Sequence, residues 1–198
     1  MKREVLVVIP ARGGSKRLPR KNILPVLGVP MVVRAAKEAA RSRHVTRVVV
    51  SSEDPEILEV CRSHGVETVV RPPALAVDDA PKQAVIEDTV VQLGQREDYR
   101  PDLVVSLQPN SPEFSADDLD PAIDFFTDKV YPHSPIKEVW SIGPDNIQNG
   151  CFRIMTYKTV FQRTLSTYVG IYFTDYVDVH HAEELAEAER RLRQRNHR

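Results

Sequence analysis

The chain has 198 residues, of which 41% are hydrophobic and 28% are charged, and its formal net charge is -1. This length and composition suffice for one domain with a sizeable core, which we expect to span residues 1–198. The balance of 27 basic and 28 acidic residues excludes a globally basic surface of the kind that binds nucleic acid.

The apolar segments are too short for a membrane or a secretory leader. No apolar run approaches the length that spans a bilayer, and the run that ends at Pro10 is shorter than the core of a signal peptide. Cys61 and Cys151 can pair in principle, but two distant cysteines are weak evidence for a disulfide framework. We therefore expect a cytoplasmic protein that binds neither membrane nor nucleic acid.

The first half of the chain alternates segments typical of strands with segments typical of helices. Short apolar runs predict buried strands at Val5–Ile9, Val45–Ser51, Glu67–Val70 and Leu103–Leu107. Apolar periodicity predicts intervening helices at Met31–Ala40, from Asp54 to a stop at Gly65, and at Lys82–Leu93. This order predicts an α/β fold with a mainly parallel sheet and helices on both faces.

The second half is less regular. Asp117 and Asp118 are expected to cap a helix that runs through Phe126, and the pattern then weakens up to Gln148. Further strands are predicted at Cys151–Met155, Tyr168–Phe173 and Val177–Val179. The chain closes with an amphipathic helix from about His181, with glutamates early and arginines late, as the helix dipole favours.

The loop after the first predicted strand carries two glycines and five cationic side chains between Arg12 and Lys21. Glycine lets the backbone approach an anion closely, and successive backbone N–H groups can form an anion-binding nest. The loop therefore predicts a cradle for a polyphosphate. It is neither a P-loop nor a dinucleotide-binding turn, because the glycine spacing of both motifs is absent.

Polar residues also follow the other predicted strands. They occur at 51–54, at 71–72, at 108–112 and, after a late strand, at 178–180. Because ligands of an open α/β sheet bind outside the carboxyl ends of its strands, we expect these residues to converge on one site.

The opening segment, Val7–Ile23, closely resembles the first motif of the acylneuraminate cytidylyltransferase family, which makes CMP-activated sugar acids. Shorter matches follow in the family's order, at Val50–Ile57, Arg71–Asp78, Leu107–Pro112, Asn149–Gly150 and Asp178–His180. The resemblance implies a nucleotide-diphospho-sugar transferase fold, of the glycosyltransferase-A type. It also implies transfer of CMP from CTP to the anomeric hydroxyl of a nonulosonate-type sugar acid, with release of pyrophosphate.

The resemblance assigns roles residue by residue. It implies that Arg12, Lys21 and Asp178 are catalytic, and that Gln108 and Asn149 contact the sugar. The nucleotide-binding set that it implies comprises Ala11, Arg12, Gly13, Lys16, Lys21, Asn22, Arg71 and Ala80.

The implied metal site departs from the family's Asp-x-Asp, because it pairs Asp178 with His180. Mg²⁺ is the expected ion, and Mn²⁺ is the alternative, since imidazole suits manganese better than magnesium. By the same resemblance, residues 113–148 correspond to a shortened version of the family's dimerisation and sugar-pocket region, and a homodimer is one of the oligomeric states that stay open. Two alternatives also stay open, a non-catalytic nucleotide-binding homologue and a nucleotidyltransferase with another nucleotide or acceptor.

Overall fold

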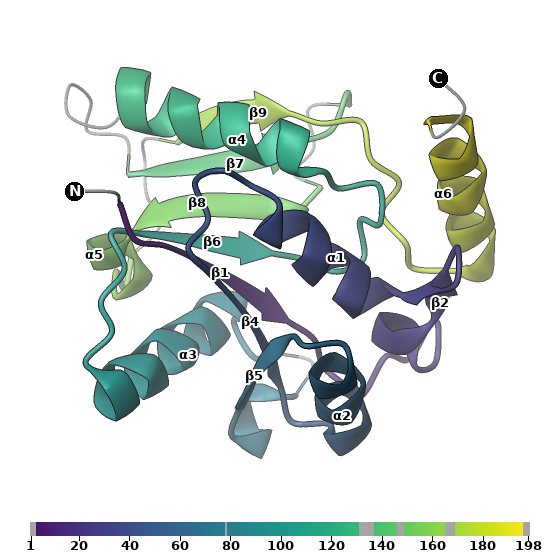
Figure 1. Cartoon of the computed structure of the whole chain (residues 1–198), viewed down its shortest axis with the longest axis horizontal. Coiled ribbons are helices and arrows are strands. Elements are labelled where there is room, and N and C mark those ends of the chain that lie inside the picture. Colours follow the sequence, from purple (N-terminus) through teal and green to yellow (C-terminus); the bar gives the residue numbers. More distant parts are fainter. Residues whose placement is uncertain (1–2, 78, 131–136, 146–148, 165–168, 196–198) are drawn as a thin grey trace.

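The computed structural model describes residues 3–77, 79–130, 137–145, 149–164 and 169–195. In this part of the chain, seven strands form one twisted sheet in the order β5-β4-β1-β6-β8-β7-β9 (Figure 1). The strands are β1 (Val5–Pro10), β4 (Arg47–Ser52), β5 (Glu67–Val70), β6 (Leu103–Leu107), β7 (Glu138–Ile142), β8 (Phe152–Thr156) and β9 (Gly170–Phe173). A separate hairpin pairs β2 (Pro25–Val26) with β3 (Val29–Pro30).

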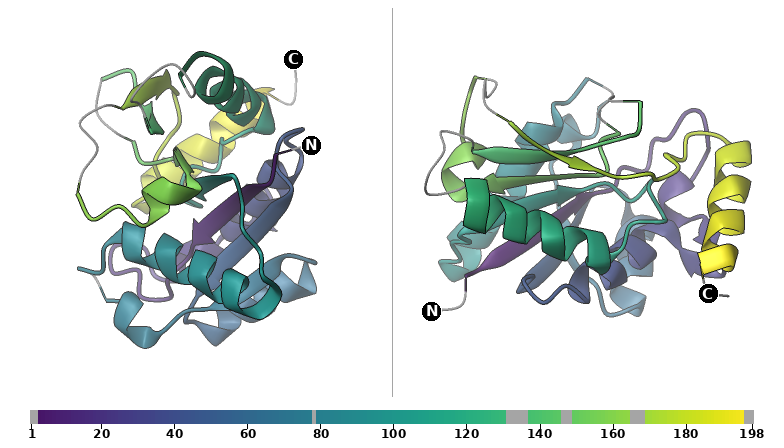
Figure 2. Two further views of the ribbon diagram at one scale, coloured as in Figure 1. Left: turned by 90° about the vertical axis from the view of Figure 1, so that its left-hand side faces the viewer. Right: turned by 90° about the horizontal axis from the view of Figure 1, so that it is seen from above.

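Helices cover both faces of the sheet (Figure 2). The α-helices are α1 (Met31–Ala40), α2 (Pro55–Ser63), α3 (Lys82–Glu97), α4 (Ala116–Asp124), α5 (Tyr157–Val160) and α6 (Ala182–Arg195). Short 3-10 turns occur at Lys21–Ile23 and Pro73–Leu75. The predicted α/β fold with a mainly parallel sheet is confirmed.

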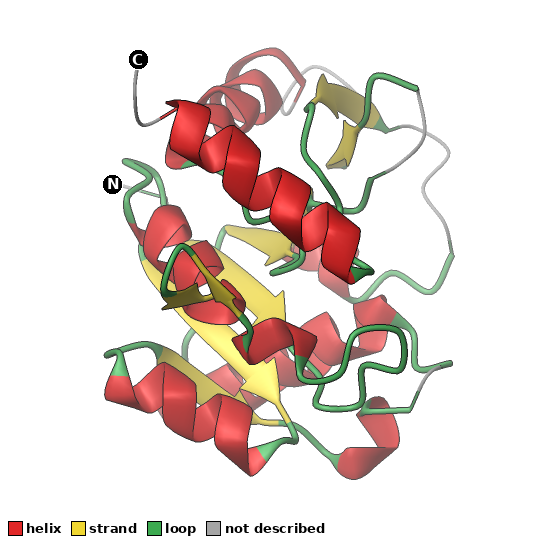
Figure 3. Cartoon of the chain, turned by 90° about the vertical axis from the view of Figure 1, so that its right-hand side faces the viewer, coloured by secondary structure: helices red, strands yellow, loops and turns green. Residues whose placement is uncertain are grey.

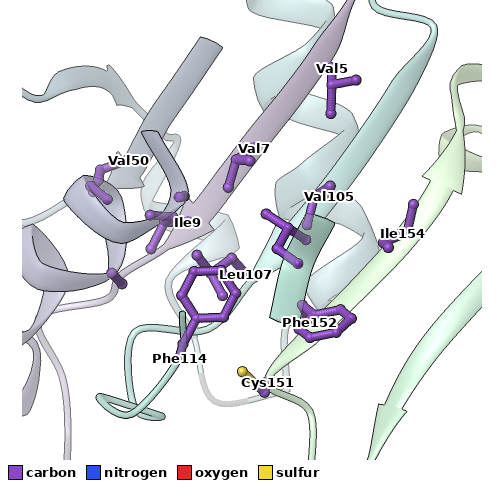
Figure 4. Close-up of a cluster of buried hydrophobic side chains, with 14 of the residues drawn as sticks. Val5, Val7, Ile9, Val50, Val105, Leu107, Phe114, Cys151, Phe152 and Ile154 are labelled. Atoms are coloured by element: carbon purple, nitrogen blue, oxygen red, sulfur yellow. The ribbon is translucent and has the colours of Figure 1, made fainter. Parts of the chain in front are cut away.

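The central strand β1 explains the two-sided core. It pairs in parallel with β4 on one side and with β6 on the other. Its residues Val5, Val7 and Ile9 pack into a cluster with α1, α2 and α4 (Figure 4), while Leu6 and Val8 pack with α3 on the opposite face. Successive side chains of a strand point to opposite faces, so a continuous apolar run is what a doubly covered strand needs.

Strand β8 is antiparallel to both of its neighbours, and this direction shapes the site. It pairs antiparallel with both β6 and β7, and Phe152 lies opposite Leu107. The start of β8 therefore lies at the same edge as the end of β6. This reversal brings the preceding Asn149-Gly150 turn to the edge where the polar loops follow the parallel strands.

Two predicted elements differ from the structure. Helix α4 begins at Ala116, because the Ser115 side chain accepts the N–H of Asp117 and caps it, and a π-helical turn at Phe125–Val130 follows α4. Residues Val177–Val179 form no strand. The Val177 N–H donates to the Glu113 carboxylate and the Val179 N–H to the Asn110 carbonyl, so both bond to a loop rather than to a strand.

Some predictions fall partly outside the described residues. Tyr168, at the start of the predicted strand that contains β9, lies outside them. The same holds for 131–136 and 146–148 within the region 113–148, so the shortened dimerisation region and the homodimer stay predictions. The structure adds β7 inside that region, which the sequence pattern did not predict.

Helix α6 packs against the β2–β3 hairpin rather than against the sheet (Figure 3). Ala188 and Leu192 of α6 are buried with Val26, Met31 and Val179. The Glu189 carboxylate also accepts the N–H of Leu27, which has a φ of 49° in the hairpin turn. The hairpin follows the glycine-containing loop, so α6 supports that loop from outside the sheet.

Both cysteines are buried and free, so the pairing that the sequence left open does not occur. Burial raises the pKa of the Cys61 thiol to about 11, which keeps it protonated at neutral pH. Within the described residues, every helix is too short or too polar to cross a membrane.

We predict that Ile154→Ala lowers the free energy of unfolding by about 2–5 kcal/mol, because Ile154 is fully buried on β8 and its removal leaves a cavity. Ile171→Ala on β9 is the matched control, because Ile171 is 48% exposed, and its expected cost is under about 0.5 kcal/mol. Urea titration measures both, and equal costs for the two variants would contradict the described packing.

Candidate functional site

A cavity of about 500 Å³ opens at the carboxyl ends of β1, β5 and β6, and we call it the main cavity. It is strongly cationic on the side of the loop after β1. Its lining includes Arg12, Lys16, Arg17, Lys21, Asn22, Arg71, Ala80, Lys82, Gln108, Asn110 and His180.

A second cavity, of about 380 Å³, adjoins it and is called the side cavity. The two cavities share Lys82, Gln108, Asn110 and His180 in their walls. The side cavity is further lined by Asn149, Arg153 and Asp178. Ten of the twelve site residues expected from the sequence therefore line one continuous pair of cavities, and the exceptions are Ala11 and Gly13.

Ala11 and Gly13 fix the loop to the end of β4 instead of facing the cavities. The Ala11 N–H donates to the Ser51 carbonyl at 2.9 Å, and the Gly13 N–H donates to Glu53 Oε1 at 2.8 Å. A Cβ atom on Gly13 would lie 2.1 Å from the Asp54 carboxylate. Glycine at this position thus permits the close approach of the loop to Asp54.

Glu53 joins this loop to Arg71. Its Oε2 atom accepts hydrogen bonds from Arg71 Nε at 2.8 Å and Nη2 at 2.6 Å, while its Oε1 accepts the N–H of Gly13. Arg71 is only 4% exposed, so its charge needs a partner in the interior, and the Glu53 carboxylate is that partner. Sequence reasoning placed Glu53 at the correct edge but did not identify it as the residue that orients Arg71.

Lys21 connects the loop to the segment that contains Asp178. Its Nζ atom donates to the Val179 carbonyl at 2.9 Å. Burial lowers the pKa of Lys21, the Asp178 carboxylate opposes that effect, and the cations Arg17 and Arg12 reinforce it. The neighbouring Asn22 is buried and donates from Nδ2 to the Arg12 carbonyl at 2.8 Å, which holds the loop in shape.

Asp178 lies in a hydrogen-bonded series with His180 and Arg17. One Asp178 oxygen accepts from Asn110 Nδ2, and the other lies 3.0 Å from His180 Nε2. His180 Nδ1 lies 2.9 Å from Arg17 Nη2. Because arginine only donates, Nδ1 accepts, and in this arrangement Nε2–H donates to Asp178.

The side chains of Asp178 and His180 suit a metal ion that takes most of its ligands from phosphate and water. Among the described residues, no three histidine, cysteine, aspartate or glutamate side chains gather as a metal centre. Asp178 is a carboxylate at the wall of the side cavity, whereas both nitrogens of His180 already have partners. Mg²⁺ characteristically binds through one or two carboxylates with phosphate and water oxygens, so Asp178 fits that ion.

Sequence reasoning missed several residues that line the two cavities, among them Arg17, Lys82, Asn110 and Arg153. Asn110 lies in the Gln-Pro-Asn-Ser-Pro segment that was recognised, and Arg17 lies in the basic loop, so both were within recognised motifs. Lys82 is the first residue of α3, a position that only the fold brings beside the end of β6.

Comparison with protein families supports the resemblance. A family model described as cytidylyltransferase matches residues 6–191. A pseudaminic acid cytidylyltransferase of Campylobacter jejuni is 38% identical over 122 residues, which cover 61% of this chain and 52% of the relative. A 3-deoxy-manno-octulosonate cytidylyltransferase of Neisseria meningitidis is 49% identical over 67 residues, 34% of this chain and 26% of the relative. The chain spans about half, or less, of the length of these curated relatives.

Solved structures confirm the fold. A CMP:2-keto-3-deoxy-manno-octonic acid synthetase complexed with CTP superposes with a TM-score of 0.77 over 97% of this chain and 99% of that chain, at 16% identity. A 4-diphosphocytidyl-2C-methyl-D-erythritol synthase from Anaerococcus prevotii gives a TM-score of 0.63 over 96% of each chain, at 12% identity. The nucleotide-diphospho-sugar transferase fold predicted from the sequence is therefore correct.

We predict that Gly13→Ala lowers the free energy of unfolding by about 1–2 kcal/mol. The new methyl group displaces the Asp54 carboxylate, which caps α2 by accepting the N–H groups of Glu56 and Ile57. Gly14→Ala is the matched control, because a Cβ there meets nothing within 4 Å. Thermal and urea unfolding measure both variants, and a stability loss at Gly14 equal to that at Gly13 would refute this account.

Proposed function

Because the chain belongs to the cytidylyltransferase family, we propose that it transfers CMP from CTP to the anomeric hydroxyl of a nonulosonate-type sugar acid and releases pyrophosphate. The observation that carries the proposal is the meeting of three loop cations, Arg12, Lys16 and Lys21, at one wall of the main cavity. The names of the relatives, which specify pseudaminic acid and 3-deoxy-manno-octulosonate, support a sugar acid as acceptor.

In the proposed reaction, the anomeric oxygen bonds to the α-phosphorus of CTP as the bond to the bridging oxygen of the β-phosphate breaks. Pyrophosphate leaves with that electron pair, and the hydroxyl proton passes to water. Such transfer needs in-line positioning and neutralisation of phosphate charge rather than covalent help from the protein. Arg12 and Lys16 would bind the outer phosphates, and Lys21 would stabilise charge at the reacting phosphate.

We propose that the two substrates bind in different cavities. Asn22, Arg71 and Ala80 line the main cavity, where they would contact the nucleotide. Asn149 lines the side cavity, and Gln108 lines both, so these amides would face the sugar. The Gln108 side chain makes no hydrogen bond to any described residue, and its amide is therefore available to a ligand.

For the metal, we propose that Asp178 is the carboxylate ligand and that His180 orients it through the Nε2–H to Oδ2 hydrogen bond. Mg²⁺ bound there would neutralise and orient the phosphate oxygens of the substrate. Mn²⁺ is the alternative ion.

Pyrophosphate release from CTP tests the proposal directly. The assay uses Mg²⁺ and then Mn²⁺, a panel of sugar acids that includes pseudaminic acid and 3-deoxy-manno-octulosonate, and ATP, GTP and UTP as controls. Release that needs CTP together with one sugar acid supports the proposal. Measurable CTP binding without release from any pair contradicts it and favours a non-catalytic nucleotide-binding homologue, for which the lone carboxylate of the metal site is the supporting observation.

We expect Lys21→Ala to lower kcat by about 10²–10³-fold, because the removed ammonium would stabilise charge that develops at the reacting phosphate. The unfolding midpoint should change little, since Lys21 makes one hydrogen bond from a partly exposed loop. Lys37→Ala on the exposed side of α1 is the control and should keep wild-type turnover. Unchanged turnover of Lys21→Ala would remove Lys21 from the mechanism.

We expect His180→Asp to raise turnover at limiting Mg²⁺ several-fold and to lower the Mg²⁺ concentration for half-maximal activity. The substitution places a second carboxylate beside Asp178, and hard oxygen ligands suit Mg²⁺. Activity measured across a Mg²⁺ titration decides the matter. A fall in activity at every Mg²⁺ concentration would contradict this prediction and show that losing the hydrogen bond from His180 to Asp178 outweighs the gain of a second carboxylate.

A further inference from the structure

Lys82 lies where the two cavities meet. It is the first residue of α3, and it lines both the main and the side cavity. A Cβ atom built on Gly150 would lie 3.8 Å from Lys82 Nζ and 3.8 Å from Gln108 Nε2. The ammonium therefore sits beside the Asn149-Gly150 turn and the Gln108 amide, at the junction of three elements far apart in sequence.

The Lys82 ammonium lacks a partner within the described part of the chain, whereas other cations of the site have one. Lys21 donates to the Val179 carbonyl, and Arg71 is paired with Glu53. Arg153, the other cation of the side cavity, donates from Nε to the buried Glu138 carboxylate at 2.6 Å and from Nη1 to Gln83 Oε1 at 2.7 Å. Lys82 is thus the cation of the side cavity that makes no hydrogen bond or ion pair with a described residue, although the Asp178 carboxylate of the same cavity attracts it.

The surroundings of Lys82 favour an anion. Lys82 as a residue is exposed, but the protein atoms near its ammonium lower its pKa by partial desolvation, an effect that the Asp178 carboxylate opposes. A partly desolvated charge without a partner is costly, and a bound anion would offset that cost. Arg12, Lys16 and Lys21 line only the main cavity, whereas Lys82 also lines the side cavity, where the acceptor is proposed to bind.

We propose that Lys82 binds the carboxylate of the acceptor and that the Gln108 amide supports it from the neighbouring wall. This inference rests on the proposed function. In a 2-keto sugar acid, the carboxylate is bonded to the anomeric carbon. A carboxylate fixed by Lys82 therefore sets the position of the adjacent anomeric hydroxyl, and Lys82 becomes a specificity residue that selects sugar acids over neutral sugars.

The test compares acid and ester in equilibrium binding, which does not require turnover. The probes are 3-deoxy-manno-octulosonate and pseudaminic acid, each beside its methyl ester, titrated into the whole chain by calorimetry with CMP present. We expect the wild type to bind one acid at least 10-fold more tightly than its ester. Lys82→Met should abolish that preference, and Lys82→Arg should retain most of it.

Two controls separate a local effect from a global one. Lys158→Met, at the opposite edge of the sheet, should leave the preference unchanged. The affinity of Lys82→Met for CTP should stay within about twofold of the wild type, and its unfolding midpoint should not move.

Three outcomes would overturn the inference. They are an acid preference that survives in Lys82→Met, a loss of CTP affinity in place of acid affinity, and a wild type that binds neither acid better than its ester. If sugar-dependent pyrophosphate release from CTP persists alongside any of these, the proposed function stands and only the role of Lys82 fails. Absence of release from every CTP and sugar-acid pair refutes the proposed function itself.

Discussion

The hydrogen bond from Lys21 to the Val179 carbonyl joins the two halves of this site. It links residues 158 positions apart and places the loop after β1 against the segment that carries Asp178. Neither segment belongs to the sheet, so the sheet alone does not fix their separation. The hairpin and α6 complete the connection, because Val26 of the hairpin and Leu192 of α6 are buried together with Val179. The cationic loop and the Asp178 carboxylate are therefore positioned by one small hydrophobic cluster.

The buried Glu113 carboxylate anchors the chain on the other side of Asp178. Glu113 accepts the Val177 N–H at 2.8 Å, and its side chain is fully buried within 4 Å of Arg191 and Arg195 of α6. Burying a carboxylate is costly unless cations and donors surround it, so α6 compensates Glu113 as well as covering the hairpin. The Val179 N–H donates to the Asn110 carbonyl, which leaves Asp178 between two anchored neighbours. This explains why the segment has defined geometry without forming the strand that its valines predict.

The sequence predicted most elements in the first half of the chain, because each apolar pattern there arises from a single kind of burial in the sheet or on a helix. Val5–Ile9 is buried on both faces, and the apolar residues of α1 face one side, so periodicity identified both elements within one residue. Val177–Val179 misled the prediction because β-branched residues indicate burial, and here the burial is against α6 rather than in a sheet. Strand β7 was missed because only its pairing with β8 and β9 reveals it. Lys82 could not be recognised, since its relevance comes from Gly150, which the reversed strand β8 brings beside it.

The reversal of β8 also orders the proposed reaction in space. Parallel strands alone would bring the loops after β1, β5 and β6 together and would form the cationic main cavity. The antiparallel β8 adds the Asn149-Gly150 turn to that edge and creates the side cavity, which shares Gln108, Asn110 and His180 with the first. In the proposed transfer, the α-phosphorus would lie at this shared wall. The acceptor oxygen would approach from the side cavity and pyrophosphate would leave toward Arg12 and Lys16, so that the two groups could stand on opposite sides of the phosphorus, as in-line transfer requires.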